Sequence, residues 1–302
     1  MVEDPQEKYS AMQALIEQAA EILIRSQATL ALTGAGISVE SGIPDFRSAG
    51  GLWSRYDPAE YASIGSFRAN PEKVWKMLME MDAIVGQARP NKAHLALGEL
   101  EDMGLLDCVI TQNVDNLHQA GGSKNVIEYH GNSSTLSCLW CGKRYAAEEK
   151  RGEDPPRCAC RKVLKPDVIF FGEAIPEEAM RRSFDLASSA QALFIIGTSA
   201  VVSPVNSIPS IAKRNGAKIV EVNKERTYLL NNKGLRILLR IWNDGIVTPR
   251  RDGMLVKEAE SLDYFEWFSF LQPHSSIIPT FHYSSRFPDL LRCYGETFSY
   301  LV

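Results

Sequence analysis

Four of the six cysteines in this 302-residue chain form two closely spaced pairs. Two residues separate Cys138 from Cys141, sixteen residues follow, and one residue separates Cys158 from Cys160. Paired thiolates on tight turns in a polar segment are typical of tetrahedral zinc sites, whereas four unrelated buried cysteines are the alternative. Because the protein would supply all four ligands, the ion would have no open position. The spacing therefore predicts one structural zinc ion rather than a zinc-activated water.

A glycine-rich turn follows a short apolar run. The run covers residues 28–33, and the sequence GAGIS occupies 34–38. Glycines allow a backbone to approach a pyrophosphate, and a helix that follows directs its N–H groups at the charge. Gly34 and Gly36 match the first two glycines of the dinucleotide-binding fingerprint, but Val39 replaces the third. The segment indicates either a nucleotide-binding turn or an ordinary tight turn of an α/β protein.

Two polar segments carry groups that could bind a nucleotide. SGIPDFR (41–47) contains Asp45 and Arg47, which could meet ribose and phosphate oxygens; a solvated surface loop is the alternative. TQNVD (111–115) ends an apolar run, where amide and carboxylate groups suit a carboxamide or a ribose. Asn113 could instead be a plain helix cap.

A candidate general base is His130, in the sequence EYHGN. It follows a short apolar run, and a histidine at such a position can accept a proton near neutral pH. A hydrogen-bonded structural histidine is the alternative, and His118 is a second candidate for the base. Each of these motifs on its own leaves the function open.

The apolar periodicity indicates the elements that must position these groups. Helical spacing predicts helices at 8–25, 72–85, 92–103 (with Asn91 as a possible cap), 176–188 and 204–215. Short apolar runs predict buried strands at 28–33, 107–111, 125–129, 168–171, 192–197 and 218–222. This alternation predicts an α/β fold with a Rossmann-like, doubly wound parallel sheet. Residues 133–165, which hold the cysteines, interrupt it as an inserted module.

Composition excludes some classes of protein. The net charge of −4 argues against direct nucleic-acid binding, because no strong basic field would attract a polyanion. No run of about 18 apolar residues is present, so no membrane span is expected. The polar, acidic start lacks the features of a signal peptide, which predicts a cytoplasmic protein. The oligomeric state does not follow from the sequence.

Taken together, the motifs resemble those of the sirtuin family. GAGIS, SGIPDFR, TQNVDNLH, YHGN, the four cysteines, KPDVIFFGE, GTSAVVSP and EVN occur in the family's order, over about residues 8–227. The resemblance implies an enzyme that transfers an acyl group from lysine to the ADP-ribose of NAD. Its partner would be an acyl-lysine protein or peptide, and its products deacylated lysine, nicotinamide and O-acyl-ADP-ribose.

The resemblance also implies roles for individual residues. His130 would be the general base that activates the ribose hydroxyl, and Asn113 and Asp115 would act at the nicotinamide pocket. The residues implied in cofactor binding are Gly34, Ala35, Gly36, Ile37, Ser38, Asp45, Phe46, Arg47, Trp53, Gln112, Asn113, Asp115, Gly197, Thr198, Ser199, Asn223, Lys224 and Glu225. Those implied in pairing with a substrate peptide are Val168, Ile169, Phe170, Phe171, Gly172 and Glu173.

The acyl group is predicted from one departure from a family pattern. Sirtuins that prefer succinyl- or malonyl-lysine carry a Tyr-x-x-Arg pair after a Val-Trp. Here Val74 and Trp75 are followed by Leu78 and Met81 at those positions. These two substrate-binding residues offer no phenol or cation to a carboxylate, so they predict an uncharged acyl group.

The resemblance implies a discontinuous domain arrangement. Residues 1–36, 91–132 and 166–227 would form the NAD-binding domain, 37–90 the cofactor loop and a helical insertion, and 133–165 the zinc module. The tail, 228–302, departs from the family, because no Asp…Gly-x-Ala segment that would cover the adenine is evident. It could be a divergent cap, a partner-binding extension or the product of a shifted reading frame. A mono-ADP-ribosyltransferase and an inactive NAD-binding protein are the competing functional interpretations.

Overall fold

The computed structural model describes residues 5–47, 50–224, 227 and 237–239. Its main sheet has the strand order β3-β2-β1-β7-β8-β9, and every neighbouring pair is parallel. The strands are β1 (Thr29–Thr33), β2 (Cys108–Thr111), β3 (Val126–Glu128), β7 (Ala192–Ile196), β8 (Lys218–Val222) and β9 (Ile237–Leu239). Successive strands lie to one side of β1 and then to the other, which confirms the predicted doubly wound sheet.

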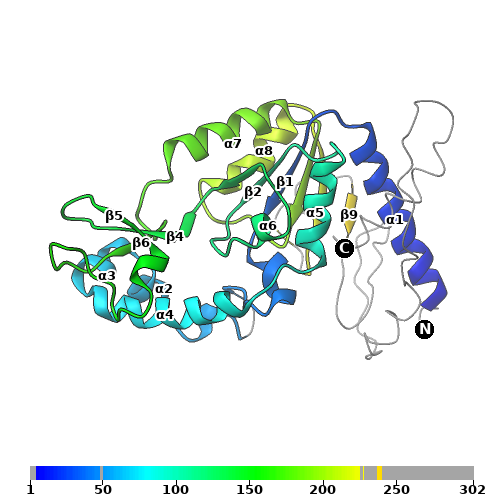
Figure 1. Ribbon diagram of the computed structural model, residues 1–302. Helices are drawn as coiled ribbons and strands as arrows, with labels where there is room; N and C mark the ends of the chain where they lie inside the picture. The colour runs from blue at the N-terminus through cyan, green and yellow to red at the C-terminus, as the bar shows by residue number, and fades with distance from the viewer. Residues whose placement is uncertain (1–4, 48–49, 225–226, 228–236, 240–302) are drawn as a thin grey trace.

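Helices cover both faces of this sheet (Figure 1). α1 (Pro5–Arg25) and α5 (Lys92–Asp102) pack on one face, and α7 (Glu177–Ser189) and α8 (Ile208–Arg214) pack on the other. Alternate residues of one strand serve the two cores: Ala31 packs with α1 and α5, whereas Leu30 and Leu32 pack with α7 and α8. Burial on both faces explains why these strands are continuous apolar runs in the sequence.

The start of α5 shows how local sequence fixes an element. The Asn91 side chain accepts the N–H groups of Ala93 and His94, and the His94 side chain reaches back to the Asn91 backbone. This capping box confirms that Asn91 caps the helix predicted at 92–103.

A smaller lobe lies beside the main sheet (Figure 1). Its helices are α2 (Pro58–Tyr61), α3 (Ile64–Ala69) and α4 (Pro71–Gln87), and its antiparallel sheet has the order β5-β4-β6. These strands are β4 (Gly131–Ser137), β5 (Arg144–Ala146) and β6 (Lys165–Val168). Helices and sheet share one core, in which Phe67 and Trp75 contact Leu164 and Phe170. The Trp75 indole N–H donates to the Leu164 C=O at 2.7 Å.

Short elements complete the described part of the chain. They are the 3₁₀ helices η1 (Ala35–Ser41), η2 (Leu52–Ser54), η3 (Ala147–Lys150) and η4 (Val205–Ser207), and the one-turn helix α6 (Leu117–Ala120). Along the residues that the structure describes, no helix combines the length and apolar character needed to cross a membrane.

The structure corrects one predicted strand. The run at 168–171 was expected in the parallel sheet, but β6 covers Lys165–Val168 and pairs antiparallel with β4 in the small sheet. Beyond β6, Phe170 is buried in the core of the small lobe, and Phe171 forms only an isolated bridge with Ser63. An apolar run indicates that its residues are buried, but it does not indicate in which sheet they lie. The prediction that 168–171 belongs to the parallel sheet was therefore wrong.

The tail contributes one strand that the sequence pattern did not reveal. β9 pairs with β8, with Val220 opposite Ile237 and Val222 opposite Leu239. The other predictions for 228–302 lie outside the described residues, as does Glu225.

Candidate active site

The strand order reverses between β1 and β7, and in parallel sheets of this kind ligands bind at such a reversal, in a crevice at the carboxyl ends of the strands. Gly34 and Gly36 follow β1 at this point, and Gly197 follows β7. The Gly36 N–H donates to the Gly197 C=O at 2.8 Å. A Cβ on Gly36 would lie 2.7 Å from the Gly197 Cα, and Gly197 itself has φ +60°. The two turns therefore touch through bare backbone, which only glycine permits. Ala35 lies half-buried between Gly34 and Gly36.

Three predicted residues form a buried polar network behind this crevice. The Asn113 Nδ2 donates to the Ser38 Oγ at 3.0 Å and to the Gly34 C=O at 3.2 Å. The Ser38 hydroxyl in turn donates to the Asp115 Oδ2 at 2.7 Å. The other carboxylate oxygen of Asp115 accepts the N–H of Leu117 at 3.0 Å. The Asn113 side chain thus serves the glycine turn and not a helix end, which excludes the helix-cap alternative.

His130 follows β3 and is held in one tautomer. Its Nδ1 lies 3.1 Å from the C=O of Gln112, and a carbonyl can only accept, so Nδ1 carries the proton. The Nε2 lone pair remains available for a proton. Burial lowers the pKa of His130, and the bond to Gln112 partly opposes that shift. The imidazole is therefore neutral at pH 7, as a general base must be.

Gln112 links the ends of three strands. Its Nε2 donates to the Thr33 C=O at 3.2 Å and to the Thr198 hydroxyl at 2.8 Å. Thr33 ends β1, Gln112 follows β2, and Thr198 lies in the turn after β7. The amide therefore fixes the loop that holds His130 relative to the glycine turns.

The segment after η1 lies over the same edge of the sheet. The Arg47 guanidinium donates to the Ser199 Oγ at 3.1 Å, and Asp45 accepts the Arg47 N–H at 3.0 Å. The rings of Phe46 and Trp53 stack with centroids 5.2 Å apart. Tertiary folding thus brings this loop to Ser199, which is 152 positions from Arg47.

Other residues predicted to bind the cofactor have different surroundings. Ile37 turns its side chain into the core beside α1 and α5, so only its backbone faces the turn. Asn223 follows β8, and its Nδ2 donates to the Glu221 Oε1 at 2.7 Å. Lys224 is exposed, and Glu225 lies outside the described residues.

The predicted substrate segment, 168–173, borders His130. The N–H of Ile169 donates to the His130 C=O at 2.8 Å. Phe171 is 48% exposed, and its backbone bonds on both sides to the helical insertion, at Ala62 and Ile64. The Phe171 ring lies 6.3 Å from that of Trp53. This segment therefore connects the histidine to the loop that carries the stacked rings.

The two residues predicted to contact the acyl group lie three positions apart on α4. Leu78 packs against the core of the small lobe, whereas Met81 packs against a separate cluster formed around Ile43. Both side chains are half-buried. Their contact with an acyl group stays a prediction.

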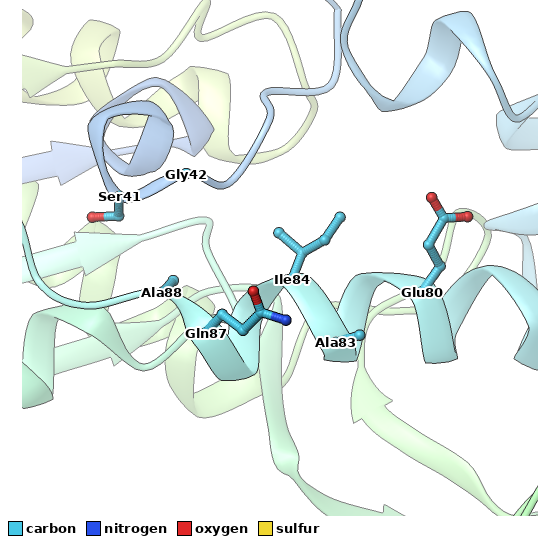
Figure 2. Close-up of a pocket in the computed structure, with 7 residues that line it drawn as sticks. All are labelled: Ser41, Gly42, Glu80, Ala83, Ile84, Gln87 and Ala88. Carbon is cyan, nitrogen blue, oxygen red and sulfur yellow. The ribbon is translucent and has the colours of Figure 1, made fainter.

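A pocket of about 520 Å³ lies one turn further along α4 (Figure 2). In Figure 2, the Ile84 side chain points from α4 towards the turn of Ser41 and Gly42. The Glu80 carboxylate at its rim already accepts bonds from Arg55 and Tyr56. The residues that line the pocket are Ser41, Gly42, Glu80, Ala83, Ile84, Gln87 and Ala88. Ser41 and Gly42 begin the SGIPDFR segment, but none of the residues assigned individually to the site lines the pocket, so the pocket borders the candidate site.

The four paired cysteines converge in the small lobe. Their Sγ atoms all lie within 4.8 Å of one another, with 3.5 Å between Cys138 and Cys160 and 3.4 Å between Cys141 and Cys158. Thiolates at about 2.3 Å from a tetrahedral zinc ion are about 3.8 Å apart. The cluster therefore fits the predicted four-thiolate zinc site.

Residues 34–204 match the Sir2 family. The chain belongs to the Sir2 family. It is 47% identical over 217 residues to NAD-dependent protein deacetylase 1 of Pyrobaculum aerophilum, covering 70% of this chain and 85% of that protein. It is 45% identical over 226 residues to NAD-dependent protein deacylase 2 of Archaeoglobus fulgidus, covering 72% and 87%.

Solved Sir2 structures share the fold. One, from a study of the mechanism and regulation of Sir2 enzymes, has a TM-score of 0.69 and 44% identity, and the match covers 72% of this chain and 89% of that one. A Sir2 structure with a p53 peptide and NAD+ has a TM-score of 0.67 and 38% identity, over 74% and 91%.

In this Sir2 chain, sequence reasoning missed His94. Its Nε2 lies 3.4 Å from the Ser38 Oγ, and its ring lies 5.0 Å from that of His118. Burial lowers the pKa of His94 to about 4, which Asp115 partly opposes, and burial lowers that of His118 to about 3. Both rings are neutral at pH 7. The spacing Asn-x-x-His at the start of α5 was the signal that could have drawn attention to His94.

The alternative base, His118, does not reach the crevice surface. It is 1% exposed, and its Nε2 lies 2.9 Å from the Thr33 Oγ1 inside the sheet. In this Sir2 chain, therefore, His118 has the surroundings of a structural histidine, and the role of His130 as the base stays a prediction.

Proposed function

We propose that this chain is an NAD-dependent protein-lysine deacylase. It transfers the acyl group of a modified lysine to the ADP-ribose that remains when nicotinamide leaves NAD, consuming one water molecule and yielding deacylated lysine, nicotinamide and O-acyl-ADP-ribose. The observation that carries the proposal is the placement of His130: a neutral imidazole, fixed through Nδ1, between the glycine turns and segment 168–173. The related proteins named NAD-dependent deacetylase and deacylase support it.

Each group near His130 has a proposed task. The His130 Nε2 accepts the proton of a ribose hydroxyl, so that its oxygen can attack the acyl carbon. We assign Asn113 to the nicotinamide, because an amide side chain suits a carboxamide. Both oxygens of Asp115 already bond to Ser38 and Leu117, so we assign it the task of orienting Ser38 and Asn113.

The glycine turns would hold the rest of NAD. Gly34, Gly36 and Gly197 allow the pyrophosphate to approach the backbone closely. Arg47 and Ser199, already hydrogen-bonded, would bind phosphate oxygens. Gln112, Thr198 and the loop of Phe46 and Trp53 border the ribose on the nicotinamide side. Asn223, Lys224 and Glu225, which follow β8, are assigned to the adenosine.

The substrate is an acyl-lysine peptide that pairs with segment 168–173. The backbone N–H and C=O of Phe171 already form hydrogen bonds with the helical insertion. The peptide would therefore pair with backbone groups that form no hydrogen bond among the described contacts, such as the Ile169 C=O and the Gly172 N–H. Recognition through backbone predicts loose sequence preference around the lysine. Leu78 and Met81 favour an acetyl or longer aliphatic acyl group.

Zinc has a structural task in this proposal. Cys138, Cys141, Cys158 and Cys160 would hold one ion with no open position, which secures β4 and β6 beside the helices of the small lobe. The proposed division keeps residues 37–90 as cofactor loop and helical insertion and 133–165 as zinc module, with β6 continuing from that module to Val168. Cysteines that bind a metal as thiolates must stay reduced, as they do in a reducing compartment. This supports a cytoplasmic location.

One assay tests the proposal. The purified chain is incubated with NAD and an acetyl-lysine peptide, and nicotinamide and O-acetyl-ADP-ribose are measured for wild type and His130→Ala. Loss of a general base should lower kcat by about 100- to 10,000-fold. Calorimetry with ADP-ribose should show that the variant still binds the nucleotide. Full activity of His130→Ala would overturn the mechanism.

Labelled NAD separates the competing functions. Label in a small acylated product indicates deacylation, and label retained on protein indicates a mono-ADP-ribosyltransferase. Absence of nicotinamide release with any acyl-peptide indicates an inactive NAD-binding protein. We expect the first result, because the proposed peptide-binding segment, 168–173, lies beside His130.

A further inference from the structure

A buried lysine lies directly behind the proposed peptide-binding segment. The Lys165 side chain is only 6% exposed, although lysines are among the residues least often buried. Its ammonium donates to the Pro166 C=O at 3.0 Å and the Val168 C=O at 2.7 Å, and it pairs with the Glu173 Oε2 at 2.9 Å. It also lies 4.4 Å from the centre of the Phe170 ring. All three N–H groups of the ammonium thus have partners, and the charge is fixed in one place.

Glu173 completes the arrangement from the other end of the segment. The same Oε2 accepts the N–H of Phe170 at 2.8 Å, and the Glu173 N–H donates to the Phe170 C=O at 3.0 Å. The Lys165–Glu173 pair therefore closes residues 168–173 into a fixed turn from its inner side, through contacts to Val168, Phe170 and Glu173.

The other side of this turn contacts both His130 and the helical insertion. Ile169 bonds to the His130 C=O, and Phe171 bonds to Ala62 and Ile64 of the helical insertion. The Phe171 ring also faces Trp53 of the cofactor loop at 6.3 Å. A change in the turn would displace the peptide-pairing groups relative to His130.

We propose that Lys165 and Glu173 are positioning residues for the acyl-lysine substrate, acting through the turn at 168–173. The inference rests on the proposed deacylase function. A buried ammonium paired with a half-buried carboxylate contributes little to stability by itself, because well-packed apolar residues of the same volume often serve equally well. The hydrogen bonds from Lys165 to the Val168 C=O and from the Phe170 N–H to Glu173 instead fix one backbone conformation. A segment that pairs with a peptide strand requires such a fixed conformation.

The experiment compares Lys165→Met, Glu173→Gln and the double variant with wild type. Lys76→Met and Glu177→Gln, at exposed positions on α4 and α7, are matched controls. KM for an acetyl-lysine peptide, KM for NAD, kcat and the melting temperature are measured for each. We expect each single variant of the pair to raise the peptide KM about tenfold or more while the NAD KM stays unchanged, since small displacements of positioning groups have effects of this size. Lys165→Arg, which keeps the positive charge, should raise the peptide KM less than Lys165→Met does.

The double variant separates positioning from stability. Removing both charges should restore most of the melting temperature lost in the single variants but not the peptide KM. Recovery of the peptide KM together with the melting temperature would show that the pair is only structural. If Lys165→Met does not fold, Glu173→Gln decides alone, because it keeps the side-chain shape and an acceptor for the Phe170 N–H.

Direct binding distinguishes this inference from the proposed function. The affinity of a fluorescent acetyl-lysine peptide is measured by anisotropy in the presence of ADP-ribose. If wild type binds the peptide but releases no nicotinamide, the deacylase proposal fails, while weaker binding by Glu173→Gln still supports the positioning role. If all variants bind the peptide as wild type does, the positioning role is wrong even where deacylation is confirmed.

Discussion

The contact between the two glycine turns leads to a sharp prediction for Gly36→Ala. The added Cβ would lie 2.7 Å from both the Cα and the carbonyl oxygen of Gly197, and 2.9 Å from its carbonyl carbon. These neighbours are backbone atoms that no rotamer change can move. Gly197 is also fixed from its other side, because its N–H donates to the Val222 C=O at 2.9 Å. The turns after β1 and β7 must therefore separate to accept a methyl group.

The cost follows from the size of the separation. An ordinary contact needs about 3.4 Å, so the turns would have to move apart by about 0.7 Å, and overpacking of this kind costs about 1–3 kcal/mol. If this free-energy cost destabilises only the conformation that binds NAD, the dissociation constant for NAD should rise by roughly 5- to 150-fold. Any part that falls on the fold should lower the melting temperature by about 2–4 °C per kcal/mol.

Calorimetric titration with ADP-ribose, together with thermal denaturation, measures both effects. Gly86→Ala is the matched control, because its Cβ would meet no atom within 4 Å and the residue lies inside α4. The control should bind as wild type does and melt at the same or a slightly higher temperature. If Gly36→Ala binds ADP-ribose and melts like wild type, the close approach of the two turns does not shape the nucleotide site.

Three further predictions follow from the site. Because burial lowers the pKa of His130 below 6.5, its neutral form persists in mild acid, so the acid limb of kcat/KM should have its midpoint below pH 6.5; a midpoint above that value contradicts the assignment. Succinyl-peptide should react about tenfold or more slowly than acetyl-peptide, since Leu78 and Met81 offer no cation, and equal rates on one peptide scaffold would refute this. Metal analysis should find one zinc per chain, and its chelation should lower the melting temperature, because the buried Cys138 and Cys158 belong to the core of the small lobe; unchanged melting would show that the fold does not depend on zinc.

Much of the scaffold followed from local sequence. β1, β2, β7 and β8 are apolar runs buried on both faces, a pattern that sequence displays directly. The Asn91 cap is equally local, because donor and acceptor lie within three residues. The paired cysteines indicated a metal site by spacing alone, and the order of the motifs identified the family.

Contacts between residues that are far apart in the sequence could not be predicted from local sequence patterns. The spacing of 168–171 did not reveal that Phe170 joins the core of the small lobe, because the partners that bury it, Phe67 and Trp75, are about a hundred positions away. Nor did sequence show that His94 lies behind Ser38, or that both oxygens of Asp115 are already bound.

The sequence by itself determined the family, the kinds of group at the site and the four cysteines suited to zinc, because each of these depends on residue type and short spacing. Only the tertiary structure distinguished the surroundings of His118 from those of His130, and the role of His130 as the base stays a proposal. His118 lies in α6, enclosed beside Thr33, whereas His130 follows β3 and is held by the Gln112 C=O with Nε2 available. It also showed why Lys165 is buried, since its partner Glu173 reaches it only when the chain turns back on itself. Charge and hydrogen bonding act through space, and the fold sets those distances.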